Sequence, residues 1–322
     1  MRLLVTGARG QVRLELSRSL LSLGDVVALD HRQCDFSRPE RLPNLIRSIK
    51  PDVIVNTAAY TAVDKAEREE KLAMTVNGTA VGVIAEESRK AGIVLVHYST
   101  DYVFDGGKQT PYTEEDVPNP INAYGRSKLA GDAAVRQAGG AYVVLRTSWV
   151  YAGRGHNFLR TILRLAGERD ELRIVDDQIG APTWTRDIAN ATAAIVRTVC
   201  RERAQGQFAS GIFNLAASGA TNWHGFAKAI LEDATRLGLL QRVPQLKPIP
   251  SEEYPVAAAR PKNSRLAGDR ISKRFGIALP DWKHGLALCI EEIKSGEQVG
   301  NKRSAEGPDG AAVDQEINNA AG

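Results

Sequence analysis

The stretch Arg2-Leu3-Leu4-Val5-Thr6-Gly7-Ala8-Arg9-Gly10-Gln11-Val12-Arg13 decides the fold. Its apolar run predicts a buried strand, its two glycines predict a turn, and a helical pattern begins at Val12. The same alternation continues downstream, with strands predicted at residues 26–29, 53–55, 93–97 and 142–146 and helical stretches between them. It predicts an α/β fold, a doubly wound parallel sheet with helices packed on it.

The organisation changes after residue 150. Helices are predicted at residues 157–168 and 185–203 and a strand at 172–175, the second helix returning toward the sheet. We therefore predict one domain over residues 1–150 and a smaller C-terminal lobe over 151–294. Residues 295–322 are rich in Gly, Ala, Asn and charge, which predicts a disordered tail. The loop 249–266 is long for a connector and is either functional or mobile.

Composition narrows the classes of partner. The 42 basic residues exceed the 38 acidic ones by only four, without a block of like charge, which argues against nucleic-acid and membrane surfaces and favours a small molecule. Cys34, Cys200 and Cys289 are too scattered for a disulfide framework or a zinc site. Without a secretory leader or an apolar run of spanning length, the expected location is cytoplasmic. The oligomeric state, a homodimer included, stays open.

The glycine-rich turn is the first candidate binding site. Gly7 and Gly10, followed by Gln11 and Val12, lie between the first strand and its helix, where backbone N–H groups and a helix N-terminus bind a pyrophosphate. This context predicts a Rossmann-type dinucleotide site, although such a turn also needs glycine for its geometry alone. The third glycine of that pattern is replaced by Arg13.

Residues after the second strand bear on the choice of cofactor. Asp30 is placed to bind ribose hydroxyls and favours NAD(H), whereas Arg32 favours the 2′-phosphate of NADPH. Asp35 either caps the helix that Pro39 opens or, with Phe36, meets the adenine edge. These signals conflict, so NADPH is expected as cofactor with NADH accepted as well.

The segment Tyr124-Gly125-Arg126-Ser127-Lys128 places a phenol and an ammonium on one face of a predicted helix. A tyrosine with a pKa of about 10 needs a nearby cation to act near neutral pH, and Lys128 is placed to supply one. The predicted strand 93–97 runs into Ser99 and Thr100, either of which offers a hydroxyl to hold a substrate carbonyl. The pattern indicates general acid catalysis on a ketone.

The chain from Arg2 to about Lys294 resembles the dTDP-4-dehydrorhamnose reductases, a branch of the extended short-chain dehydrogenase/reductases. The resemblance rests on long ordered motifs. They are residues 56–67 (NTAAYTAVDKAE), 99–106 (STDYVFDG), 124–128 (YGRSK), 146–151 (RTSWVY), 177–183 (DQIGAPT) and 260–266 (RPKNSRL).

The resemblance implies roles for individual residues. It assigns Thr100, Tyr124 and Lys128 as the catalytic trio, Tyr124 and Lys128 also contacting the cofactor. It implies further that the cofactor is lined by Ala58, Ala59, Tyr60 and Thr61, and that the C-terminal lobe binds substrate. The sugar nucleotide would contact Thr100, Asp101, Tyr102, Tyr124 and Trp149. Arg260 is a reasonable diphosphate ligand because its planar fork matches phosphate oxygens.

The implied reaction is reduction of the C4 keto group of a dTDP-linked 4-keto-6-deoxysugar, dTDP-4-dehydro-L-rhamnose, by NADPH or NADH. Two alternatives stay open: a 4-ketoreductase of a related nucleotide-linked deoxysugar, and a non-catalytic nucleotide-binding subunit similar to the regulatory subunit of methionine adenosyltransferase. Arg13 departs from the family's glycine. Some family members bind magnesium through a glutamate where this chain has Trp184-Thr185-Arg186, so no metal is expected.

Overall fold

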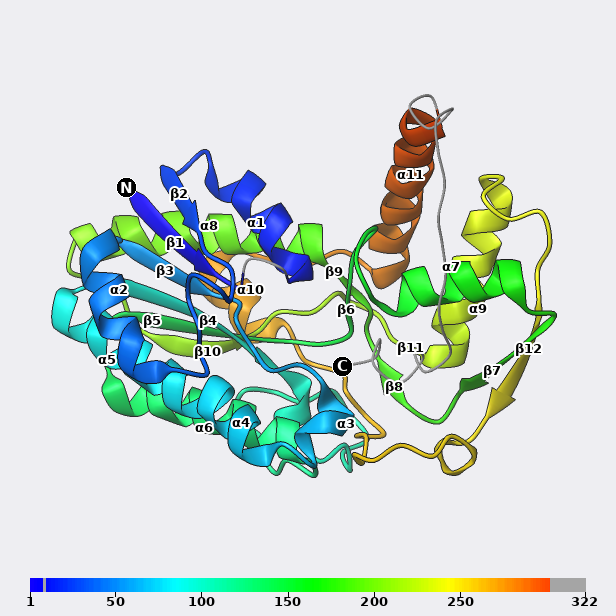
Figure 1. The fold of residues 1–322 in the computed structure, drawn as a ribbon, viewed down its shortest axis with the longest axis horizontal. Helices are drawn as coiled ribbons and strands as arrows, with labels where there is room; N and C mark the ends of the chain where they lie inside the picture. The colour runs from blue at the N-terminus through cyan, green and yellow to red at the C-terminus, as the bar shows by residue number, and fades with distance from the viewer. Residues whose placement is uncertain (8–9, 302–322) are drawn as a thin grey trace.

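The computed structural model describes residues 1–7 and 10–301, with side chains described as far as residue 296. A parallel sheet of six strands forms its centre, in the order β10-β5-β4-β3-β1-β2 (Figure 1). The strands are β1 Arg2–Thr6, β2 Asp25–Ala28, β3 Val53–Asn56, β4 Val94–Thr100, β5 Tyr142–Thr147 and β10 Gly211–Asn214. The strand order reverses between β1 and β3, which makes the carboxyl ends of these strands the expected ligand site. The predicted doubly wound parallel sheet is confirmed.

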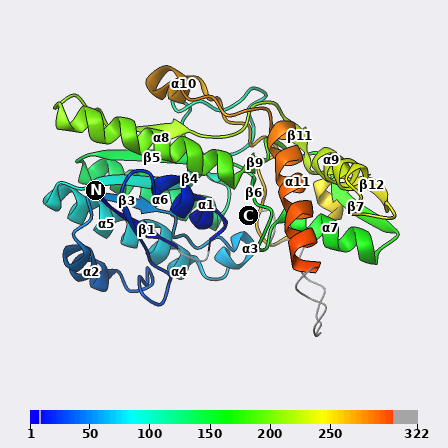
Figure 2. The ribbon, with the colours of Figure 1, turned by 90° about the horizontal axis from the view of Figure 1, so that it is seen from above.

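Helices cover both faces of this sheet because its strands are apolar on both sides. Leu3 and Val5 pack under α1 Gln11–Leu20, α8 Thr185–Ala204 and α10 Asp269–Phe275. Leu4, between them in sequence, packs on the other face with α2 Leu42–Ile49, α5 Ala80–Ala91 and α6 Ala123–Ala138. Figure 2 shows α8 running beside α1 above the sheet, so residues beyond 150 complete the first domain.

The helix that precedes β4 is interrupted in its middle. After the short helix α3 Val63–Ala66, α4 Glu70–Met74 continues through a π-helical turn, Thr75–Thr79, into α5. The turn buries a polar residue, Asn77, against α6. A π-helical turn inside an α-helix is often found at a functional site.

The C-terminal lobe has its own aromatic core. Its helices are α7 Phe158–Glu168, α9 Trp223–Arg236 and α11 Trp282–Asn301, and they pack with the parallel pair β7 Glu171–Val175 and β12 Gln245–Ile249. Short pairs join β6 Val150–Tyr151 to β9 Thr183–Trp184 and β8 Ile179–Gly180 to β11 Thr221–Asn222. Single 3₁₀ turns lie at Pro39–Arg41, Asp101–Val103 and Ser251–Glu253.

The predicted tail begins too early. Helix α11 continues through Asn301, and the Ser295 hydroxyl donates to the Glu291 carbonyl one turn before it, as in a continuing helix. Composition misses this extension because polar residues on an exposed helix carry no apolar period. The predicted disorder of residues 302–322 lies outside the described residues.

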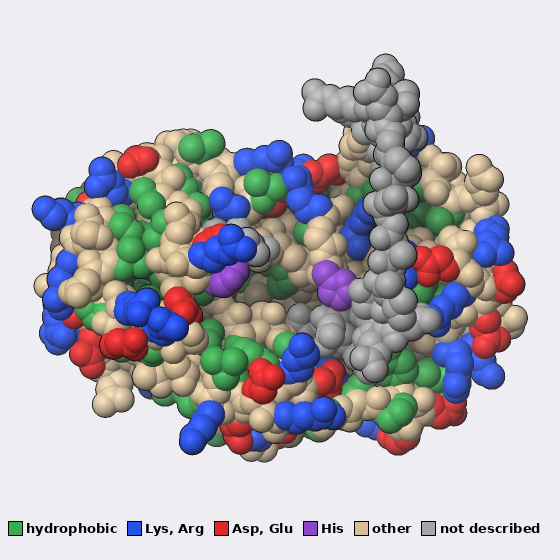
Figure 3. All heavy atoms as spheres, in the orientation of Figure 1, with side chains coloured by type: hydrophobic (Ala, Val, Ile, Leu, Met, Phe, Trp, Pro, Cys, Tyr) green, Lys and Arg blue, Asp and Glu red, His purple; other side chains and the backbone are tan. Residues whose placement is uncertain are grey.

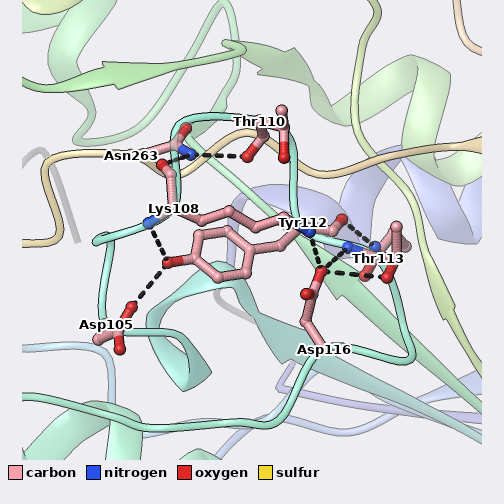
Figure 4. Close-up of polar contacts among 8 residues, drawn as sticks. Asp105, Lys108, Thr110, Tyr112, Thr113, Asp116 and Asn263 are labelled. Atoms are coloured by element: carbon pink, nitrogen blue, oxygen red, sulfur yellow. Dashed lines mark hydrogen bonds and ion pairs between the residues drawn. The ribbon is translucent and has the colours of Figure 1, made fainter.

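Residues 258–267, called the strap here, are held against the loop that follows β4 (Figure 4). The Asn263 amide donates to the carbonyls of Lys108 and Thr110 at 2.6 and 2.9 Å. The Tyr112 hydroxyl donates to Asp105 at 2.7 Å, and the Tyr112 carbonyl accepts from Ala267 N at 2.8 Å. The long loop predicted to be functional or mobile is therefore anchored at this end, beside the carboxyl end of β4.

Charged side chains of both signs are interspersed over the face shown in Figure 3, as expected from the near balance of charge. Within residues 1–7 and 10–301, no helix combines the length and apolar character needed to span a membrane.

Candidate active site

Two predicted catalytic residues meet at the carboxyl edge of the sheet. Thr100 is the last residue of β4, and Tyr124 lies in the first turn of α6. The side chain of Asn122 caps α6 by accepting from Gly125 N at 2.7 Å. A Cβ on Gly125 would lie 2.2 Å from the Tyr102 carbonyl oxygen, so only glycine lets this helix approach so closely. The rings of Tyr102 and Tyr124 consequently meet edge to face, 5.6 Å apart.

The polar groups of this cluster are buried. The Thr100 hydroxyl donates to Asp101 Oδ1 at 3.0 Å and accepts from Tyr102 N at 3.2 Å. Burial raises the pKa of Tyr124, while the Thr100 hydroxyl acts to lower it. Burial also raises the pKa of Asp101 to about 6, although hydroxyls of Ser264 and Thr100 oppose the change. The site therefore holds a protonated phenol and a carboxyl group with a pKa of about 6.

Lys128 is held by a backbone carbonyl of β4. Its ammonium donates to the Tyr98 carbonyl at 2.6 Å, and burial lowers its pKa to about 8. Burial dominates the titration of the Tyr124 phenol and raises its pKa, so a stabilisation of the phenolate by Lys128 stays a prediction. Lys128 lies one helical turn after Tyr124 and is fixed against β4 by the Tyr98 carbonyl.

An ion pair that the sequence did not reveal lies behind Lys128. Asp132 follows it by one turn of α6 and bonds Arg146 of β5 at 3.1 Å, with both side chains at most 3% exposed. The Asp132 carboxylate raises the pKa of Lys128 against the effect of burial. A carboxylate four residues after the lysine was the available signal in the sequence.

The glycine-rich turn fits a bound dinucleotide. Gly7 has a φ of 75°, and a Cβ there would lie 2.7 Å from Ala58 N, so the turn approaches the loop after β3 closely. Gly10 caps α1 without a side chain, which leaves the helix N-terminus to an anion. Gln11 Oε1 is buried and has no hydrogen-bond partner among the described residues, and Val12 beside it is half-buried.

Asn77 connects the loop after β3 to the catalytic helix, and the sequence analysis missed it. Its side chain accepts from Tyr60 N at 2.8 Å and donates to the Tyr60 carbonyl at 3.0 Å and to Ser127 Oγ at 2.9 Å. The Ser127 hydroxyl in turn donates to the Tyr124 carbonyl at 2.7 Å. The fully buried Asn77 amide thus fixes both the loop after β3 and α6. In the sequence, its one indication was a polar residue within an otherwise buried helical stretch.

The rest of the loop after β3 presents its backbone. Asn56 Oδ1 accepts from Ala58 N at 3.1 Å and from the Thr6 hydroxyl at 2.6 Å, which joins this loop to β1. Ala58 and Ala59 are half-buried and Thr61 is exposed. The four residues that the resemblance assigned to the cofactor thus lie together at the switch point of the sheet.

The residues after β2 are more exposed. The Asp30 carboxylate accepts from Arg32 N and Gln33 N at 2.9 and 3.2 Å, and so shapes the turn. Asp35 accepts from Ser37 N and its hydroxyl, so its carboxylate stabilises this turn and does not cap the 3₁₀ turn that Pro39 opens. The Phe36 side chain packs in the core under α2, which leaves its backbone alone to face a ligand. Arg32 lines a hollow of about 380 Å³ together with Asp35, Arg41 and neighbouring α2 residues.

The predicted substrate residues fall into two groups. Asp101 and Tyr102 lie beside Tyr124, and the Arg260 guanidinium lies 6.0 Å from the centre of the Tyr102 ring. Arg260 is only 7% exposed and pairs with Asp64 at 2.8 Å. It borders a hollow of about 320 Å³ in the C-terminal lobe, which is also lined by Phe158, Gln178, Trp223, Tyr254 and Lys262.

Trp149 lies on the C-terminal side of the site. Its φ of 47° is unusual for a bulky residue, and its indole stacks on Trp223 with ring centres 3.5 Å apart. A Cβ on Gly180 would lie 2.4 Å from the Trp149 indole. Trp223, but not Trp149, lines the hollow of about 320 Å³ in the C-terminal lobe.

In the segment Trp184-Thr185-Arg186, where no metal is expected, the arginine forms ion pairs. Arg186 pairs with Glu15 of α1 at 3.0 Å and with Glu292 of α11 at 2.9 Å. Over the described part of the chain, no group of three or more His, Cys, Asp or Glu side chains is placed to hold a metal.

The switch-point loops and the Thr100–Tyr124–Lys128 arrangement define an NAD(P)-dependent oxidoreductase of the short-chain type. The family model described as the RmlD substrate binding domain matches residues 1–295. A dTDP-4-dehydrorhamnose reductase of Burkholderia thailandensis is 52% identical over 92% of this chain and 100% of its own length. One of Shigella flexneri is 42% identical over 91% and 98%, respectively.

Solved structures agree. A dTDP-4-dehydrorhamnose reductase of Bacillus anthracis in complex with NADP superposes with a TM-score of 0.83 at 34% identity, covering 90% of this chain and 99% of that one. The chain belongs to the dTDP-4-dehydrorhamnose reductase family.

Proposed function

We propose that the protein reduces the C4 keto group of dTDP-4-dehydro-L-rhamnose to give dTDP-L-rhamnose, with NADPH as the preferred cofactor and NADH accepted. The observation that carries this proposal is the meeting of Thr100 and Tyr124 at the switch-point edge, in a chain 52% identical to a relative of that name. In this proposal, residues 1–150 bind the cofactor and residues 151–294 mainly bind the sugar nucleotide. Within the second range, β10 belongs to the central sheet, and α8 and α10 pack on it.

The residues present fit a dinucleotide. Gly7 and Gly10, with the free N-terminus of α1, would hold the pyrophosphate, and the loop of Ala58 to Thr61 would line the nicotinamide half. When bound, the reduced nicotinamide supplies the hydride. Tyr124 donates a proton to the forming C4 alkoxide, so ketone, hydride and proton together give the alcohol. Thr100 holds the carbonyl oxygen, and the buried Lys128 cation stabilises the phenolate that remains.

Further assignments follow from position. Asp101, Tyr102 and Trp149 would contact the sugar, and Arg260 would bind the diphosphate at the border of the C-terminal hollow. Arg260 would have to exchange part of its pairing with Asp64 for phosphate oxygens. The proposed location is the cytoplasm.

The experiment is a coupled assay that follows NADPH and NADH oxidation with dTDP-4-dehydro-L-rhamnose, combined with NMR identification of the product sugar. Formation of dTDP-L-rhamnose with either cofactor supports the proposal. Turnover confined to a related 4-keto sugar would replace the substrate assignment, and binding without turnover would indicate a non-catalytic subunit.

A further inference from the structure

The Thr100 hydroxyl has only one proton, and the Asp101 carboxylate beside it can only accept. With Asp101 ionised, the Thr100 proton is donated to Asp101 Oδ1 at 3.0 Å, while the oxygen of the same hydroxyl accepts from Tyr102 N. A hydroxyl engaged in this way has no donor left for a substrate carbonyl. The role proposed for Thr100 therefore requires that Asp101 release this proton.

Asp101 is placed to change its hydrogen bonding. Its side chain is 3% exposed, and its second oxygen, Oδ2, is buried without a hydrogen-bond partner among residues 1–7 and 10–301. The groups facing it come from several elements. They are Thr100 of β4, Tyr102 of its own turn, Tyr124 of α6, Ser148 after β5 and Ser264 of the strap.

No cation of the described chain forms an ion pair with Asp101. Arg260, whose guanidinium lies 6.0 Å from the centre of the Tyr102 ring, is paired with Asp64. Hydrogen bonds from neighbouring hydroxyls offset only part of the cost of keeping this charge in a buried site, because burial still dominates the pKa of Asp101. Protonation is the available route to a neutral group, because a carboxylic acid can donate where the carboxylate only accepts.

We propose that Asp101 is a positioning residue that sets the direction of the Thr100 hydroxyl. As a carboxylate it accepts the Thr100 proton and holds it away from the substrate. As the acid it donates its own proton to Thr100 Oγ1, which leaves the Thr100 proton free for the carbonyl oxygen of the substrate. The inference rests on the proposed function, since it assumes a ketone above Thr100 and Tyr124.

The inference gives a definite pH dependence. Because the active form carries the proton, kcat rises as the pH falls through the pKa of Asp101, about 6 in this structure. A single donor to a developing oxyanion is worth about 10² to 10³ in kcat, so the rise should reach at least about tenfold. The loss of activity at high pH that follows deprotonation of Lys128, with its pKa of about 8, is separate.

The test is the kcat profile from pH 5 to 9 at saturating NADPH and dTDP-4-dehydro-L-rhamnose. Asp101→Asn, nearly equal in shape, should lose the inflection near pH 6 and keep the fall at high pH. Thr100→Val should also lose it, at a lower kcat, whereas Thr100→Ser should retain it. Glu115→Gln, a charge loss at an exposed ion pair with Arg270, should leave the profile unchanged.

Three outcomes would overturn the inference: an inflection retained by Asp101→Asn, one of full amplitude retained by Thr100→Val, or none in the unaltered protein. A rise in KM alone for Asp101→Asn, with the profile intact, would make Asp101 a simple substrate ligand. If the unaltered protein does not turn over this substrate at any pH, the proposed function fails, which is a distinguishable result.

Discussion

The nicotinamide end and the adenosine end of the proposed cofactor site are built differently. At the nicotinamide end, the buried Asn77 side chain bonds the Tyr60 backbone and the Ser127 hydroxyl, and Ser127 bonds the Tyr124 carbonyl. These hydrogen bonds join the π-helical turn, the loop after β3 and α6. At the adenosine end, the Asp30 and Asp35 carboxylates accept hydrogen bonds from residues two or three positions further along the same turns. The hydrogen bonds at the nicotinamide end hold each of these side chains in one position. At the adenosine end, Arg32 lines a hollow of about 380 Å³. We therefore expect kcat to fall strongly when a single atom is removed at the nicotinamide end. Substitutions at the adenosine end should change the preference for NADPH over NADH.

The largest effect should come from removing the phenol oxygen. Tyr124→Phe keeps the ring that packs against Tyr102 but has no proton to donate, so kcat should fall by about 10² to 10⁴. The dissociation constant for NADPH, measured by fluorescence titration, should change less than about threefold. If the Phe variant turns over within a few-fold of the parent, catalysis at the nicotinamide end does not depend on the Tyr124 proton.

The rigidity itself can be tested at Asn77. Asn77→Ala leaves Tyr60 N, the Tyr60 carbonyl and Ser127 without their partner, and each buried unsatisfied group costs about 1 to 3 kcal/mol. We expect a lower midpoint in urea and weaker NADPH binding. Asn190→Ala, at an exposed position on α8, is the matched control. Equal stability of the two variants would mean that the amide is not a structural connection.

The same contrast separates what the sequence predicts from what it does not. Tyr124 and a hydroxyl at the end of the strand follow from a local motif and from the rule that parallel strands end at one edge, so their meeting could be predicted. The choice of Thr100 over Ser99 came from the family resemblance and not from spacing. The partner of Lys128, the Tyr98 carbonyl, could not, because it depends on the register between α6 and β4. Asn77 and Asp132 find their partners 50 and 14 residues away, a distance at which spacing carries no information. Phe36 could not be placed from the sequence either, because its apolar side chain packs in the core under α2 while its backbone continues the turn after β2.

The adenosine end should respond to charge. Arg32→Ala should move the ratio of kcat/KM values for NADPH and NADH toward NADH by up to about tenfold, because a guanidinium bonds a phosphate with charge assistance. Arg41→Ala, from the same hollow, is the companion variant. A ratio changed by Arg41→Ala and not by Arg32→Ala would move the phosphate contact from the turn to the start of α2. An unchanged ratio in both would place the 2′-phosphate away from this hollow.

The smallest effect is expected at Arg13, in the first turn of α1, between the nicotinamide and adenosine ends of the proposed cofactor site. Its Nε is buried without a hydrogen-bond partner among the described residues, which costs free energy that glycine would not. Glycine inside a helix loses about 1 kcal/mol relative to alanine, so the two contributions partly cancel. The position normally packs against the strand and not the ligand, and steric relief should prevail.

Arg13→Gly should bind NADPH about two- to threefold more tightly by calorimetric titration, with kcat at saturation unchanged. Arg18→Gly, exposed on the same helix, introduces the same helix penalty and should leave the dissociation constant as it was. Weaker binding in Arg13→Gly alone would mean that the guanidinium reaches a phosphate oxygen, with an electrostatic gain larger than the packing cost.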